Sequence, residues 1–179
     1  MTAMIVVLLL IEFVLLMAWV GGYYRWGLPL FSRRIKVPRA ALLDFPFGQL
    51  ENETTREQWP SLRFHPLSKR SCAFRESMGI HFGWRYPPMM RGLIQIDLQR
   101  SEIRVVGWCN WTVLAGALSA IPALAVAPSG VLVVALLCLA SYLVQRHRYL
   151  CVEEAVRTLA TRERLSPLGP ARIPLPPRM

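Results

Sequence analysis

Apolar side chains are gathered into two long stretches of the chain. Residues 3–20 contain one charged side chain, Glu12, and residues 105–145 contain none. A helix that crosses a bilayer needs about 20 consecutive apolar residues, so the first stretch predicts one transmembrane helix. The second stretch is about twice that length. The turn signal at residues 128–130, Pro-Ser-Gly, divides it into two arms and predicts a helical hairpin.

The two arms are short for spans. Each has about 16 residues, near the lower limit for crossing, so the hairpin either crosses the membrane or enters it and returns on the same side. We expect it to cross. The first arm also carries small side chains on one face, which predicts close packing against another helix; these are Gly116, Ala117, Ser119 and Ala120.

The polar middle of the chain, residues 25–104, shows the two-residue alternation of strands. Residues 80–86 alternate in this way, and residues 92–106 predict a β-hairpin with a polar turn at 99–102. Weaker strand candidates are residues 42–47 and 62–64. Residues 48–60 predict a loop with a helical turn near 55–59.

After the second apolar stretch, residues 149–165 have helical periodicity. Apolar positions repeat with the spacing of one helix face, so we expect an amphipathic helix that continues the preceding span without a break. It should end before Pro167. Residues 166–179 contain five prolines and no acidic residue, which predicts an extended tail that does not fold alone.

The expected fold is therefore a membrane protein of the α+β class. It has three transmembrane helices, an N-terminal anchor and a C-terminal hairpin, with a small, mainly antiparallel β domain between them. The expected segments are an anchor (1–24), a cytoplasmic domain (25–104), a transmembrane hairpin (105–145), an amphipathic helix (146–165) and a proline-rich basic tail (166–179).

Composition and charge agree with a membrane protein and give it an orientation. Hydrophobic residues make up 54% of the chain and charged residues 18%, against about 25% charged in soluble domains. The net charge is +10. Basic residues follow the first predicted span, and none precedes it. The positive-inside rule therefore predicts an external N-terminus and a cytoplasmic bulk, which we assign to a bacterial inner membrane. Residues 1–3 carry no charged side chain, so we expect a retained anchor and not a cleaved signal peptide.

Glu12 is the most unfavourable residue for a span, because a carboxylate at mid-membrane costs a few kcal/mol unless it is paired. Three hypotheses remain open. Glu12 accepts hydrogen bonds from another helix, either in a partner or at Ser119, Ser141 or Tyr142 of this chain. It sits protonated or near a water-filled cavity without a role. Or it conducts protons or ions.

Two basic regions suggest binding partners. Residues that follow the first span are placed to contact anionic phospholipid headgroups; they are Arg33, Arg34, Lys36 and Arg39. In the tail, Arg172 and Arg178 offer charge-assisted hydrogen bonds to a partner subunit. A tail without any role is the alternative.

No sequence pattern indicates a catalytic, metal-binding or nucleotide-binding site. The four cysteines contain no C-x-x-C pair, the three histidines lack metal spacing, and there is no phosphate-binding glycine loop. We therefore expect no enzyme activity, no cofactor and no nucleic-acid partner.

The leading hypothesis is a non-enzymatic accessory or scaffold subunit of a larger membrane complex, in contact with other integral membrane subunits and anionic phospholipid. One alternative is a small homo-oligomeric channel or transporter component that uses Glu12. Another is a membrane-bound lipid-handling protein or enzyme with a site in the cytoplasmic domain.

Overall fold

The protein has an α+β fold built on one antiparallel sheet. The computed structural model describes residues 2–43, 45–54, 61–77, 90–126 and 128–165. Five strands lie in the order β1-β5-β4-β3-β2, and every neighbouring pair is antiparallel. The strands are β1 (Pro29–Lys36), β2 (Leu62–Ser68), β3 (Ser71–Glu76), β4 (Arg91–Asp97) and β5 (Glu102–Trp108).

The β4–β5 hairpin shows how the local sequence sets the strand pairing. Asp97 Oδ1 accepts hydrogen bonds from the backbone N–H of Gln99 (2.9 Å) and of Arg100 (3.1 Å). An aspartate that bonds the backbone two and three residues ahead favours a turn. The pairing continues from Asp97 and Glu102 to Arg91 and Trp108 at the other end.

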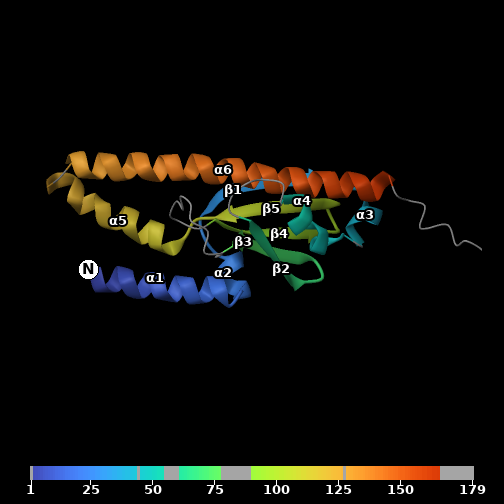
Figure 1. Ribbon diagram of the computed structural model, residues 1–179, viewed down its shortest axis with the longest axis horizontal. Helices are drawn as coiled ribbons and strands as arrows, with labels where there is room; N and C mark the ends of the chain where they lie inside the picture. The colour runs from blue at the N-terminus through green and yellow to red at the C-terminus, as the bar shows by residue number, and fades with distance from the viewer. Residues whose placement is uncertain (1, 44, 55–60, 78–89, 127, 166–179) are drawn as a thin grey trace, which may run out of the picture.

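One face of the sheet is covered by the second half of helix α6 (Pro128–Leu165) (Figure 1). Tyr149 of α6 packs directly on the sheet. Its ring stacks on Phe31 of β1, with 5.3 Å between ring centroids, and its hydroxyl donates to the carbonyl oxygen of Arg91 (2.8 Å). A Cβ at Gly107 would overlap the Tyr149 ring, so glycine is needed there. The other α6 residues in this core are Val152, Ala155, Val156, Leu159 and Ala160.

The opposite face is covered near β3 by the end of helix α1 (Thr2–Met17) and by the short helix α2 (Gly21–Arg25). Leu16, Tyr23 and Tyr24 pack against Ala73 of β3. The side chains of β3 therefore meet helices on both faces, and the whole strand is buried.

Shorter elements lie around the far end of α6. These are α3 (Arg39–Leu43), the 3-10 helix η1 (Phe47–Gln49) and α4 (Leu50–Thr54). Leu50 is fully buried in the main core. Glu53 of α4 accepts a hydrogen bond from Arg162 of α6 at 2.7 Å, which ties this end of the domain to the long helix.

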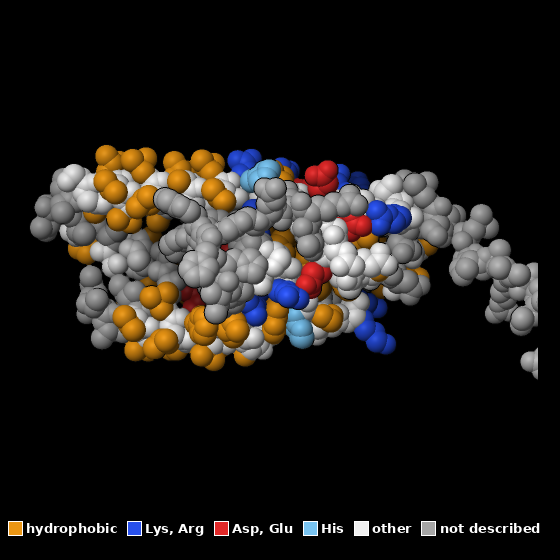
Figure 2. All heavy atoms as spheres, in the orientation of Figure 1, with side chains coloured by type: hydrophobic (Ala, Val, Ile, Leu, Met, Phe, Trp, Pro, Cys, Tyr) orange, Lys and Arg blue, Asp and Glu red, His pale blue; other side chains and the backbone are white. Residues whose placement is uncertain are grey.

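Three helices extend together from the other end of the sheet: α1, α5 (Trp111–Val126) and the first half of α6 (Figure 1). Their outer surface is apolar, and Figure 2 shows such side chains along α6 and along α1. Large apolar residues at least half exposed are Met4, Val6, Val7, Leu9, Leu10, Val14, Leu118, Ile121, Leu132, Val133, Val134, Leu136, Leu137, Leu139 and Leu143. Among the described residues one helix, Ser129–Arg162, is long and apolar enough to cross a membrane, and almost none of its apolar window is buried.

Several sequence predictions are confirmed. The hairpin at residues 92–106 exists, with its turn at residues 98–101, one residue before the predicted position. Residues 62–64 belong to β2, and the amphipathic helix continues the preceding apolar helix without a break. The sheet is antiparallel throughout, as expected. The predicted strand at residues 80–86 and the turn near 55–59 lie outside the described residues.

Two predictions are wrong. Residues 42–47 do not form a strand: Leu42 and Leu43 end helix α3, with Leu42 buried and Leu43 exposed. Alanine and leucine favour helix, and the adjacent residues Ala41 and Leu42 are both buried, which the two-residue alternation of a strand with one buried face does not give. Residues 128–130 do not form a turn, because α6 begins at Pro128. At the first position of a helix the missing N–H of proline costs nothing.

Candidate functional site at the helix–sheet junction

Glu12 is the centre of a buried polar cluster where α1, α2 and α5 meet the sheet. Its side chain is 4% exposed. Oε1 accepts hydrogen bonds from the Tyr23 hydroxyl (2.5 Å) and the Trp111 backbone N–H (2.7 Å), and Oε2 accepts one from the Thr112 backbone N–H (2.9 Å). The sequence hypothesis named Ser119, Ser141 or Tyr142 of this chain, or a partner helix, as the donor; the structure places Tyr23 of α2 and the backbone of Trp111 and Thr112 in α5 at the carboxylate.

The two backbone donors belong to the first turn of α5. Backbone N–H groups in the first turn of a helix have no partner within the helix, and the partial positive charge there favours an anion. Glu12 therefore caps α5 from another helix. This capping accounts for a carboxylate in an otherwise apolar α1.

Arg91, the first residue of β4, lies on the other side of Tyr23. Its guanidinium carbon is 3.6 Å from the centre of the Tyr23 ring. Nη1 donates to the carbonyl oxygen of Tyr23, and Nη2 donates to that of Cys109 at 2.6 Å. Burial lowers the pKa of Arg91, and its neighbours Tyr23 and Glu12 oppose that change. Arg91 thus joins α2 to the residues between β5 and α5.

A second cluster turns the chain at the end of α1. Trp19 has a φ of 51°, a conformation that is uncommon for a residue other than glycine. Its ring stacks between Tyr24 (centroid distance 5.5 Å) and His65 (5.0 Å), and the Arg75 guanidinium lies 4.6 Å from it. These contacts hold the end of α1 against β2 and β3.

On the opposite face a buried ion pair joins α6 to the sheet. Arg148 of α6 donates to Glu76 of β3, and both side chains are less than a tenth exposed. Removing one member of such a pair leaves an uncompensated buried charge. The pair therefore helps to fix α6 over the sheet.

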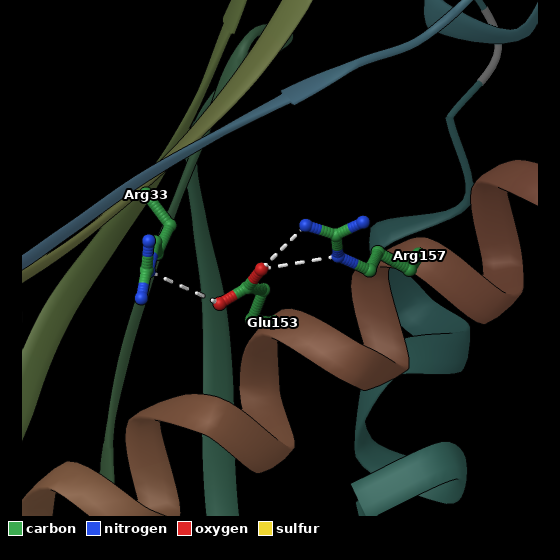
Figure 3. Close-up of polar contacts among 3 residues, drawn as sticks. All are labelled: Arg33, Glu153 and Arg157. Carbon is green, nitrogen blue, oxygen red and sulfur yellow. Dashed lines mark hydrogen bonds and ion pairs between the residues drawn. The ribbon is translucent and has the colours of Figure 1, made fainter.

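The basic run that follows the first apolar stretch lies on the sheet domain. Arg33 and Arg34 are in β1: Arg33 Nε lies 3.8 Å from Glu153 Oε2, and Arg34 Nε lies 3.9 Å from Glu102 Oε1. Glu153 also accepts two hydrogen bonds from Arg157, at 2.7 and 3.0 Å (Figure 3).

The other two members of this run are Lys36 and Arg39. Lys36 is exposed at the end of β1, and Arg39 Nε donates to the carbonyl oxygen of Leu98 at 3.3 Å. Lipid binding by these four residues stays a prediction. Arg172 and Arg178 lie outside the described residues.

The described residues include no group of three or more His, Cys, Asp or Glu side chains that could hold a metal ion. Cys72 is fully buried, and burial raises the pKa of its thiol to about 12. A neutral thiol is a poor nucleophile and metal ligand. The chemistry that the Glu12 cluster supports directly is structural: it joins two helices and the sheet.

Sequence reasoning found Glu12 but missed Tyr23 and Arg91. Tyr23 belongs to an aromatic group at the end of an apolar run, which resembles an interfacial belt, yet it is 2% exposed and packed within the protein. Arg91 directly precedes the predicted hairpin at residues 92–106. The one usable signal was Asn110, a residue type favoured at helix N-caps before an apolar run; it marks the start of α5 but does not identify Glu12 as the group that caps it.

Comparison with protein-family models, with curated proteins and with solved structures finds no match for this chain.

Proposed function

We propose that the chain is a non-enzymatic accessory subunit of a larger complex in a cytoplasmic membrane. In this arrangement α1, α5 and the first half of α6 lie in the bilayer as three transmembrane helices. The N-terminus is external, and the sheet domain is cytoplasmic. The observation that carries the proposal is an apolar surface that spans three helices and includes the partly exposed small residues Gly116 and Ala117 of α5.

The extent of the apolar surface supports the membrane placement. A soluble monomer rarely exposes a large continuous apolar patch, whereas α1 and the first half of α6 expose large aliphatic side chains along their length (Figure 2). At 1.5 Å per residue, the 16 residues of α1 or α5 extend about 24 Å. This is slightly less than the roughly 30 Å hydrocarbon core, so these helices suit a thin or locally thinned bilayer.

The face of α5 supports a protein partner. A Cβ added at Gly116 would meet nothing within 4 Å, and Ala117 is exposed. Small residues at a helix surface let another helix approach closely in a membrane. Since no described residue fills the space beside Gly116, a helix of another subunit could pack there.

The geometry of Glu12 argues against the channel alternative. A carboxylate that conducts protons or ions has to be reached by water, whereas Glu12 is 4% exposed and accepts three hydrogen bonds from its own chain. The proposed role for Glu12 is to hold α1 and α5 together.

The test is purification of the tagged full-length protein in a mild detergent from its native cells, followed by mass analysis of the intact complex. We expect a complex with other integral membrane proteins. Gly116→Leu should reduce recovery of that complex severalfold, because the added side chain fits the isolated chain but fills the space of the partner helix.

Leu118→Phe is the matched control. Leu118 is 68% exposed on the same helix, so added bulk there should leave recovery unchanged. A wild-type protein that runs as a monomer would contradict the proposal, and a homo-oligomer would favour the channel alternative. Equal recovery of both variants would exclude Gly116 as the contact.

The proposal also gives the tail a role. Residues 166–179 dock on a partner subunit, with Arg172 and Arg178 bonded to its acidic or phosphate-bearing surface. Deleting residues 166–179 should leave membrane insertion intact and reduce recovery of the complex. Equal recovery at matched expression and salt would remove this role.

A further inference from the structure

The segment between α2 and β1 is held at the level where α5 begins. The Cys109 backbone N–H donates to the carbonyl oxygen of Leu28 at 2.8 Å, one residue before the helix cap Asn110. Gly27 has a φ of +156° and lies against Arg91 and Trp108. On this fixed loop, Trp26 is 78% exposed and Leu28 is 53% exposed. Trp26 is thus an aromatic side chain that the described protein leaves uncovered beside the start of α5.

Arg146 reaches the same level on the opposite face of the sheet. Tyr149 lies on Gly107, the second residue before Cys109. Arg146 precedes Tyr149 by three residues, or about 4.5 Å along α6 in the direction of the apolar half. Side chains on a helix lean toward its N-terminus, so the exposed guanidinium of Arg146 points to the level of the α5 start.

Arg25 and Arg146 also lack acidic partners. Both side chains are exposed, and neither forms an ion pair with any described residue. Several other arginines of the domain have carboxylate partners, including Arg33, Arg148 and Arg162. No carboxylate of the described residues thus competes with an external anion for the two cations that border the apolar helices.

We propose that Arg25, Trp26, Leu28 and Arg146 form a collar around the helix–sheet junction that binds the headgroups of anionic phospholipids. The inference rests on the membrane placement proposed above. Trp26 and Leu28 enter the interfacial layer, where amphipathic rings are favoured. The two guanidiniums bind phosphate oxygens, while their aliphatic stems lie along apolar surface.

The course of β1 explains why the collar differs from the basic run expected from the sequence. Pro29 pairs with Trp108 next to α5, whereas Lys36 pairs with Glu102 at the far end of the sheet. Seven residues of strand separate these positions by about 23 Å. When α5 enters the bilayer at Trp111, Lys36 lies far from the headgroups.

The test measures lipid binding to the full-length protein in detergent by native mass spectrometry, with phosphatidylglycerol and phosphatidylcholine as probes. Each cation at a membrane surface is worth about a fivefold change in binding. The double variant Arg25→Gln/Arg146→Gln should therefore weaken phosphatidylglycerol binding by about 25-fold and change phosphatidylcholine binding little.

The control Lys36→Gln/Arg70→Gln removes two exposed charges at the far end of the sheet and should leave phosphatidylglycerol binding unchanged. Equal loss in both double variants, or no loss in the first, would overturn the collar. Carbonate extraction of membranes separates this failure from that of the membrane placement. A protein released by carbonate contradicts the placement, and a retained protein with unchanged lipid binding contradicts only the collar.

Discussion

The carboxylate of Glu12 accepts a hydrogen bond from the backbone N–H of Trp111, ninety-nine residues further along the chain. Through this bond the first helix caps a helix that follows the sheet in the chain. The sequence between them contains all five strands. The position of α1 therefore depends on a folded sheet, and the start of α5 depends on α1.

Substitution of Glu12 should weaken the protein in a graded way. Glu12→Gln keeps one acceptor oxygen but presents an amide N–H₂ to a backbone N–H. We expect it to lower the free energy of unfolding by about 1–3 kcal/mol. Glu12→Leu leaves the buried Tyr23 hydroxyl without its acceptor, and should cost more. Thermal unfolding in detergent, followed by tryptophan fluorescence, measures both losses. Val14→Ala, at an exposed site of the same helix, should have little effect. Unfolding temperatures equal to wild type in both Glu12 variants would contradict the capping role.

Gly107→Ala should destabilise the sheet domain by about 1–3 kcal/mol, the range typical of overpacking. The added methyl group would overlap the Tyr149 ring and push α6 from the sheet. Denaturant unfolding of the full-length protein measures the change. Gly48→Ala is the control, because a Cβ there meets nothing within 4 Å. The double variant Gly107→Ala/Tyr149→Leu should regain part of the loss, and no recovery would show that the strain lies elsewhere.

Arg148→Met should be among the most destabilising single changes, by about 3–5 kcal/mol, because it leaves Glu76 charged and buried. The double variant Glu76→Leu/Arg148→Met should be closer to wild type. Arg157→Ala removes an ion pair whose arginine is 59% exposed, and should cost less than about 1 kcal/mol. These losses are read from unfolding midpoints. Equal effects of Arg148→Met and Arg157→Ala would show that the Glu76 pair is solvated.

Cys72 should make stability fall at high pH. Its pKa is raised from 9.0 to about 12 in the folded protein, so the folded state favours the neutral thiol. This stabilisation is complete below about pH 9 and is lost as the pH rises toward 12, since the unfolded chain releases the proton first. Unfolding midpoints at pH 8 and 10.5 should therefore differ less in Cys72→Ala than in wild type. Equal differences would contradict the shift, as would rapid maleimide labelling of folded Cys72 at pH 8.

Single cysteines at positions 52, 129 and 170 in a cysteine-free background test the proposed orientation. Ser129 at the start of α6 is exposed and Asn52 in α4 is partly exposed, and α4 lies by the sheet domain, far from the start of α6 (Figure 1). A membrane-impermeant maleimide added to intact cells should label only position 129. External labelling at 52 or 170 would reverse the topology.

The fold was predictable where one local pattern decides the structure. The alternation in residues 92–106 gave the β4–β5 hairpin, and the 3.6-residue period after Tyr149 gave the buried face of α6. Strand β1 was missed because Phe31 and Ile35 are its only well-buried side chains and the three residues between them are basic or polar. An edge strand of this kind is defined by its partner β5 and has no strong pattern of its own.

The candidate site was predictable only in part, for a related reason. A lone carboxylate in an apolar helix signals that a partner exists, but the partner of Glu12 is the backbone of Trp111 and Thr112. Backbone donors carry no side-chain signature. Arg91 is likewise defined by the carbonyl oxygens of Tyr23 and Cys109, which come together only when the sheet is complete.

Helix α6 runs for 38 residues from the apolar end of the molecule to the far end of the sheet. At 1.5 Å per residue this is a rod of about 57 Å. Its first half carries the exposed leucines and its second half carries Tyr149 and Val152 in the core. No loop interrupts the rod between these halves, so there is no joint at which motion could be absorbed. If neighbouring helices tilt or rotate the apolar half of α6, the second half therefore tilts or rotates with it. The whole sheet domain then moves as one body.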